Sequence, residues 1–99
     1  MLESLTQEKF KENLNSPFKL QFIDEQSLDL QLIECNDLGS SEVQEQYSLI
    51  FRGDGEHYLK QMIYSLTHEK LGELSLFLVP VRKDANGYQY EAVINRFHQ

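Results

Sequence analysis

Hydrophobic and polar residues alternate along most of the chain from residue 17 onward. The first two alternating segments flank a polar turn at residues 24–27 and place apolar side chains at Phe18, Leu20, Phe22, Leu28, Leu30 and Leu32. Further segments of this kind cover residues 47–51, 62–66, 73–81 and 88–97. A period of two predicts strands. Because turns rather than helices separate about six of them, the sequence predicts a mainly β fold, a small antiparallel barrel or sandwich.

The region before these segments predicts one short helix, over about residues 6–14. Thr6 is a suitable N-cap, and the helix is expected to end near Leu14 because Asn, Ser and Pro follow. Leu5 and Phe10 occupy the two positions of a hydrophobic staple. A helix this short is unstable in water by itself. We therefore expect it to pack as a lid on a β body over about residues 17–97.

Two irregularities interrupt the alternation. At Leu32-Ile33 the period slips by one residue. One extra residue there would keep Ile33 and Cys35 inward and Glu34 outward, which predicts a β-bulge. Residues 37–45 form the longest polar stretch and predict a mobile loop.

The segment over residues 73–81 is apolar on both faces. Its apolar side chains are Leu74, Leu76 and Leu78 on one face and Phe77, Val79 and Val81 on the other. Neither face can be left to water, so we expect the second to be covered by the N-terminal helix or, alternatively, by a subunit contact. Pro80 has no backbone N–H, which places this part of the strand at an edge or a bulge.

The net charge of the chain, −7, is concentrated in one third of it. Residues 20–51 contain no Lys or Arg and carry the carboxylates Asp24, Glu25, Asp29, Glu34, Asp37, Glu42 and Glu45. We expect most of these to form one exposed acidic patch. Such a surface repels nucleic acid and anionic membranes and attracts a basic protein partner. Solubility is an equally simple role for it.

Length and composition favour a single domain over residues 1–99. The chain lacks the features of a secretory signal or a membrane span, which favours a cytoplasmic, bacterial-type location. Cys35 is the only cysteine, so no intrachain disulfide can form. A lone cysteine in an apolar run is expected to be a small buried hydrophobe.

No motif in the sequence predicts catalysis, a metal site or a cofactor. The histidines His57, His68 and His98 lie far apart and outside zinc-ligand spacings, so we expect them in turns or the tail. Residues 54–56 are acidic and contain glycine, but they lack the pattern of about twelve residues that defines a calcium loop. Neither a nucleophile motif nor a phosphate-binding loop is present, so we expect no enzyme activity.

Arg52 and the tyrosines are the remaining candidates for recognition. Arg52 ends an apolar strand beside Gly53. It is expected to form a salt bridge with Asp54, Glu56 or a carboxylate of a neighbouring strand. In the alternative it makes a recognition contact that uses the planar, bidentate geometry of arginine. The tyrosines are expected in the core of the strands with hydrated hydroxyls: Tyr47, Tyr58, Tyr64, Tyr88 and Tyr90.

Four segments give the chain a specific resemblance. They are the opening LESLT with Phe10, FRG at residues 51–53, YSLTHEKLGELSLFLVPV at residues 64–81 and DANGYQYEAVINR at residues 84–96. Together they resemble a family of short, uncharacterised bacterial proteins that consist of a single domain of unknown function. The resemblance implies no activity, cofactor or catalytic residue. It does imply that relatives lie near genes for phage-tail-collar-like proteins, which favours an assembly or accessory role.

These observations favour a non-enzymatic interaction or assembly module that presents its acidic face, with Arg52 and Gly53, to another protein of basic charge. Phe77, Val79 and Val81 are the candidate contact of a homodimer. The alternative is a small-ligand carrier that binds in the mouth of the barrel, with Arg52 and a tyrosine hydroxyl as polar anchors. An enzyme is the least favoured class. Neither leading hypothesis involves nucleic acid, a membrane or a cofactor.

Overall fold

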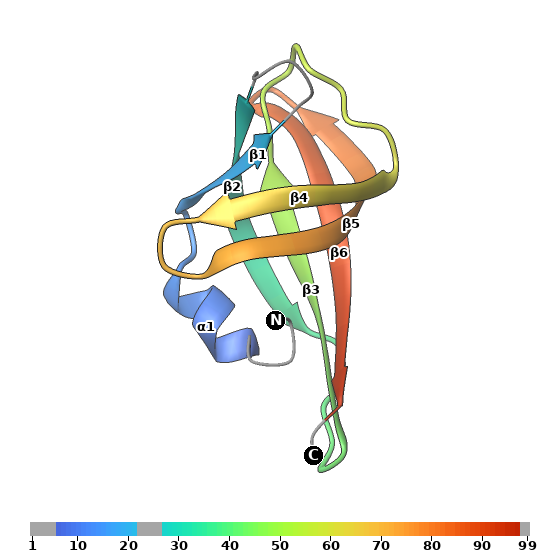
Figure 1. The fold of residues 1–99 in the computed structure, drawn as a ribbon. Helices are drawn as coiled ribbons and strands as arrows, with labels where there is room; N and C mark the ends of the chain where they lie inside the picture. The colour runs from blue at the N-terminus through green and yellow to red at the C-terminus, as the bar shows by residue number, and fades with distance from the viewer. Residues whose placement is uncertain (1–5, 22–26, 98–99) are drawn as a thin grey trace.

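The computed structural model describes residues 6–21 and 27–97, which form one short helix and six strands (Figure 1). In chain order the elements are α1 (Gln7–Glu12), β1 (Pro17–Gln21), β2 (Ser27–Asp37), β3 (Gln44–Arg52), β4 (Met62–His68), β5 (Gly72–Asp84) and β6 (Gly87–Phe97). The predicted mainly β fold with one N-terminal helix is confirmed. Some residues used in the predictions lie outside the described residues: Leu5, Phe22, Asp24, Glu25 and His98.

The six strands are antiparallel, in the order β1-β2-β3-β6-β5-β4, and close into a barrel rather than a sandwich. Strands β1 to β3 and β4 to β6 are two meanders, and the long β3–β6 pair joins them on one side. On the other side β1 meets β4 through two residue pairs, Lys19 with Thr67 and Leu20 with Leu66. Figure 1 shows β3 and β6 side by side, with β4 and β5 crossing in front of them.

The inner face of the barrel is filled by side chains from α1, the strands and the β3–β4 connection. These residues are Phe10, Phe18, Leu20, Leu30, Leu32, Tyr47, Leu49, Phe51, Leu59, Leu66, Leu74, Leu76, Leu78, Tyr90, Ala92 and Ile94. Alternation along the strands therefore also determines which face is buried. The predicted core position is wrong for Tyr58, which is exposed because it lies in the β3–β4 connection and not in a strand.

Helix α1 lies at one end of the barrel (Figure 1). It packs there through a single large side chain, that of Phe10. Phe10 is fully buried, and its ring centroid lies 6.5 Å from that of Phe18 and 5.9 Å from that of Tyr47. The helix thus sits on the β body, as expected for a helix too short to be stable alone.

Helix α1 is shorter than the sequence predicts and ends at residue 12. At its start, the Thr6 hydroxyl accepts a hydrogen bond from the Lys9 N–H, as an N-cap does. At its end, the Asn13 side-chain amide donates to the Lys9 carbonyl at 2.8 Å, and Asn15 has a left-handed φ of 67°. A residue in the left-handed region cannot continue an α-helix, so the chain turns away here.

The bulge predicted at Leu32-Ile33 and the irregularity predicted at Pro80 are both present. The β2–β3 register shifts between Leu32 and Glu34, where Ile33 and Cys35 are half-buried and Glu34 is exposed. Burial raises the pKa of the Cys35 thiol, in keeping with a small, partly buried hydrophobe. The β5–β6 register shifts directly after Pro80, a residue that cannot donate to the strand ladder.

The second apolar face of β5 is not covered by α1, so that prediction is wrong. Phe77 and Val81 each keep 49% of their surface exposed. Helix α1 packs against β2 instead, and its Phe10 points toward the ring of Tyr47. The physical reason is that Phe10 fits the end of the barrel, where two aromatic rings receive it, whereas this face of β5 belongs to the outer wall.

Candidate functional site

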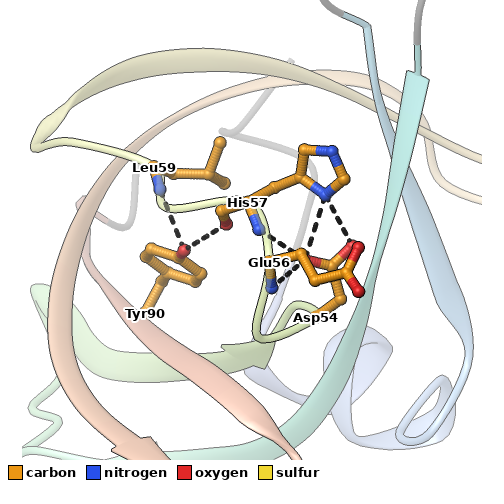
Figure 2. Close-up of polar contacts among 5 residues, drawn as sticks. All are labelled: Asp54, Glu56, His57, Leu59 and Tyr90. Carbon is orange, nitrogen blue, oxygen red and sulfur yellow. Dashed lines mark hydrogen bonds and ion pairs between the residues drawn. The ribbon is translucent and has the colours of Figure 1, made fainter.

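Residues 53–61 connect β3 to β4 at the end of the barrel away from α1 (Figure 1). Tyr90 of β6 holds this connection. Its hydroxyl accepts a hydrogen bond from the Leu59 N–H at 3.0 Å and donates one to the His57 carbonyl at 3.3 Å (Figure 2). Leu59 itself is buried in the core. The mouth of the barrel is therefore occupied by the chain.

Asp54 shapes the same connection by capping the backbone N–H groups that follow it. Its carboxylate accepts hydrogen bonds from the N–H of Glu56 at 3.0 Å and of His57 at 2.7 Å, and its Oδ2 lies 2.9 Å from His57 Nδ1 (Figure 2). The hydrogen bond from the His57 side chain, and then those from the backbone, lower the pKa of the Asp54 carboxyl. His57 thus lies in a turn, as expected.

Gly87 allows the β3–β4 connection to touch the β5–β6 turn. It has a φ of +132°, and a Cβ atom added there would lie 1.9 Å from the Gly53 carbonyl oxygen. At this contact the Gly53 N–H donates to the Tyr88 carbonyl at 2.9 Å, and the Tyr88 N–H donates to the Asp54 carbonyl at 3.4 Å. Only a residue without a side chain permits this close approach.

Arg52 lies on the outer wall and forms a salt bridge, as predicted, but its partner is a carboxylate of β5, which lies beyond β6 and is not a neighbouring strand of β3. Its Nη2 is 3.5 Å from Asp84 Oδ2, and the Gln89 side-chain amide donates to the same oxygen at 2.7 Å. Within the described residues, neither Asp54 nor Glu56, the nearby alternatives, forms an ion pair with Arg52. Arg52 Nε is buried and has no hydrogen-bond partner in the described part of the chain.

Arg52 also lines an open depression of about 330 Å³ on the outer wall, with Asp29, Gln31 and Gly53 among its other lining residues. A carrier of small ligands needs an enclosed, mainly apolar cavity, whereas this depression is open and most of its lining residues are polar. The two polar anchors expected for a carrier already have partners, because Arg52 pairs with Asp84 and the Tyr90 hydroxyl holds the chain.

The predicted acidic patch is divided between two faces of β2. Asp29 and Glu34 are exposed on its outer face. Asp37 is also exposed, but it lies on the side of α1, where it accepts a hydrogen bond from the Gln7 side chain at 3.2 Å. The bulge after Leu32 shifts the alternation by one residue and causes this division. The expectation of one continuous patch is therefore wrong for Asp37.

Glu45 does not belong to the acidic patch, because it is buried. Its Oε1 accepts a hydrogen bond from the Gln7 N–H at 2.6 Å, and its Oε2 lies 3.3 Å from Arg96 Nη1. The predicted loop over residues 37–45 is also too long: β3 begins at Gln44, so strand alternation turns Glu45 inward. Glu42 stays exposed in the connection between β2 and β3.

A further carboxylate, which the sequence pattern did not bring to notice, joins the outer face. In the strand register Ile50 of β3 lies between Glu34 of β2 and Glu91 of β6. Glu91 in turn lies opposite Val79 of β5. The alternation along β6 places Glu91 on the outer face, so the sequence pattern of this strand could have identified it. We call Asp29, Glu34 and Glu91 the acidic surface.

Apolar side chains remain exposed on the outer wall beside the acidic surface. Ile63 of β4 and Phe77 of β5 are register partners and are 64% and 49% exposed. Val93 of β6 is also 49% exposed and lies two residues beyond Glu91. We call Ile63, Phe77 and Val93 the apolar stripe. Of these three residues, only Phe77 was singled out from the sequence.

His68 is buried at the end of β4 and its hydrogen bonds require a neutral ring. Its Nδ1 accepts from the N–H groups of Lys70 at 3.0 Å and Leu71 at 3.1 Å, and its Nε2 lies 2.8 Å from Ser16 Oγ. The ring centroid is 4.4 Å from that of Phe18. Burial lowers the pKa of His68. The histidine therefore holds the β4–β5 turn and the end of the α1–β1 connection together.

We expect the free energy of unfolding to fall as the pH is lowered below about 6.5, the ordinary pKa of histidine. Because the pKa of His68 is lower in the folded chain, the unfolded chain binds a proton at pH values where the folded chain does not. Denaturant melts at about pH 7.5 and 5.5 measure this loss. The loss is expected to be smaller in His68→Asn, whose amide oxygen can accept the same turn N–H groups without titrating. Equal losses in the two proteins would assign the effect to another group.

The fold and these surfaces define a small antiparallel β-barrel, packed by a helix at one end and by its own β3–β4 connection at the other. Residues 5–94 match a family model described as "Domain of unknown function (DUF6916)", and the chain belongs to this family. Neither the curated proteins nor the solved structures contain a match to the chain. In the described residues, no helix is long and apolar enough to cross a membrane.

Proposed function

We propose that this protein is a non-enzymatic interaction module that binds another protein through the outer wall of its barrel. The observation that carries this proposal is the position of the acidic surface directly beside the apolar stripe, with Glu91 and Val93 on the same face of β6. Burial of apolar surface drives most protein association, and flanking charges select the partner. The module would act as an assembly or accessory factor in the cytoplasm of a bacterial cell.

The charge of the chain favours a basic partner. The net charge is −7, and exposed carboxylates attract opposite charge over roughly 10 Å at moderate salt. Asp29 and Glu34 are exposed on β2, and Glu91 extends the same sign of charge across β3 to β6. We therefore expect association with the partner to be faster at low salt than at high salt.

Nothing in the described residues favours the carrier hypothesis over this one. Leu59 and the other core side chains fill the barrel, and the Tyr90 hydroxyl is engaged by the backbone of the connection above it. A ligand could enter only by displacing these groups.

Reversing two charges of the acidic surface tests the proposal. In Asp29→Lys with Glu34→Lys, we expect association with a partner isolated from the native cell to slow by about tenfold at about 0.05 M salt. Surface plasmon resonance measures the rates, and raising salt to about 0.5 M should remove most of the difference. The matched control is Glu12→Lys with Glu69→Lys, which makes the same charge change at exposed positions on α1 and in the β4–β5 turn. If both double variants slow association equally, the effect comes from net charge alone, and the proposal is contradicted.

A further inference from the structure

Strands β5 and β6 pair along only part of their lengths. Their register ends where Val79 lies opposite Glu91. Beyond that pair, β5 continues to Gly72 bonded to β4 alone and β6 continues to Phe97 bonded to β3 alone, among the residues that the structure describes. Figure 1 shows the two strands diverging at this point. We call the opening between them the seam.

The hydrogen bonds of β3 show which of its backbone groups point toward β6. The Gln46 carbonyl accepts a hydrogen bond from the Leu38 N–H at 2.8 Å, so the backbone groups of Gln46 point toward β2. Successive residues of a strand direct their N–H and C=O groups to alternate sides. Those of Tyr47 therefore point toward its register partner on β6, Ile94.

The same alternation along β6 identifies the groups that point into the seam. Ile94 faces β3, so its neighbours Val93 and Asn95, and then Phe97, face away from β3. Glu91 is two residues from Val93, so its backbone groups also face away from β3. It forms the last β5–β6 pair, with Val79, which agrees with this assignment. Val93, Asn95 and Phe97 thus each present an N–H donor and a carbonyl acceptor to the seam. These backbone groups have no strand partner in the described residues.

This edge lacks the usual protection of an exposed strand. Natural edge strands carry lysine, proline or a bulge that discourages pairing with another chain. Here the side chains are Val93, Asn95 and Phe97, and the nearby Arg96 is paired with Glu45 instead of covering the edge. Val93 and Phe97 are 49% and 69% exposed. Free backbone groups with apolar side chains beside them are the features that strand-adding ligands recognise.

We propose that an extended segment of a partner protein adds as a strand to β6 within the seam. This inference rests on the proposed function and gives the chemistry of its partner. The segment hydrogen-bonds to the edge, and its outward apolar side chains cover Phe77 and Val93. Glu91 at the closed end of the seam and Glu73 on the facing strand favour Lys or Arg in the segment. A second copy of this chain is disfavoured, because each copy carries a net charge of −7.

A labelled synthetic peptide tests the strand addition. The probe is an acetylated, amidated peptide of about nine residues in which Val and Thr alternate between terminal lysines, and fluorescence anisotropy measures its affinity. In Asn95→Pro the seam-facing N–H is lost while the bonds between β3 and β6 remain, so we expect binding to weaken by about tenfold or more. The matched control, Asn95→Ala, loses the same side chain but keeps the N–H and is expected to bind like the parent.

Three outcomes would overturn the inference. The first is no saturable binding of the peptide to the parent protein up to about 1 mM. The second is equal affinity for Asn95→Pro and Asn95→Ala, with far-UV circular dichroism showing both folded. The third is a parent protein that is dimeric by light scattering and an Asn95→Pro variant that is monomeric, which would assign the seam to a second copy.

If Asn95→Pro does not fold, Val93→Pro removes another seam-facing N–H and replaces it in the comparison.

The same variants separate this inference from the proposed function. Association with a native partner that depends on Asp29 and Glu34 but is indifferent to Asn95→Pro would retain the interaction module and overturn strand addition. Loss of association in Asn95→Pro but not in Asn95→Ala is the expected result.

Discussion

Replacing Phe10 with alanine is expected to lower the free energy of unfolding by about 3 kcal/mol, within the range for aromatic side chains removed from a core. Phe10 is fully buried between Phe18 and Tyr47 and is the one buried residue of α1. Its loss would leave a cavity at the end of the barrel and remove the anchor of the helix. Chemical denaturation of the parent and the variant measures the difference.

Leu14→Ala is the matched control for this loss. Leu14 follows α1 and is 37% exposed, so its truncation is expected to cost less than about 1 kcal/mol. Double mutants give a second check on where the helix packs. The losses of unfolding free energy from Phe10→Ala and Phe18→Ala should not be additive, whereas those from Phe10→Ala and Phe77→Ala should be. A Phe10→Ala protein within about 0.5 kcal/mol of the parent would contradict the packing of α1.

Gly87→Ala is expected to destabilise the fold by about 3 kcal/mol or more. The new Cβ atom would lie 1.9 Å from the Gly53 carbonyl oxygen and 3.0 Å from backbone carbon atoms of Gly53 and Asp54, and a φ of +132° is already unfavourable for alanine. Since these neighbours are backbone atoms, relief requires the β3–β4 connection to move away from the β5–β6 turn. Thermal or denaturant melts would show the loss.

Gly39→Ala separates the clash from the backbone strain. Gly39 has a comparable φ of +126°, but a Cβ atom there would meet nothing within 4 Å. Its substitution is expected to cost about 1 to 2 kcal/mol from conformation alone. If Gly87→Ala costs no more than Gly39→Ala, the close contact between the two turns contributes little to stability.

The strands and their inner face could be predicted from the sequence because a period of two is a local property. Leu30 and Leu32 point inward as their spacing requires, and the slip after Leu32 marks the bulge that the register contains. Pro80 likewise marks the second shift, since its missing N–H is evident without a structure.

The errors arose where a side chain's position depends on distant parts of the chain. The N-terminal helix is expected to cover β5, but the position that its Phe10 occupies exists only after β1 closes the barrel against β4. Glu45 was assigned to a loop, and its burial depends on Arg96, which comes from the last strand. Local polarity could not indicate that ion pair.

For the same reason, the candidate site could be predicted only in part from the sequence. Asp29 and Glu34 were identified as exposed acids, and Arg52 as one member of a salt bridge. The seam was not foreseen, because a free edge at Asn95 is a property of strand order and register. Alternation along β6 predicts its two faces but says nothing about which edges have partners.

The two-meander arrangement of the barrel has a consequence for the order of folding. Within each meander the strands pair with their neighbours in sequence, whereas the β3–β6 and β1–β4 pairs join opposite halves of the chain. Loop-closure entropy must be lost before those distant pairs contribute, which is typical of β-proteins that fold in milliseconds to seconds. Until then Tyr47 on one half and Tyr90 on the other have no common interior to occupy. Neither half of the sequence is therefore a folding unit, and a nascent chain must expose its apolar faces until the last strand is available.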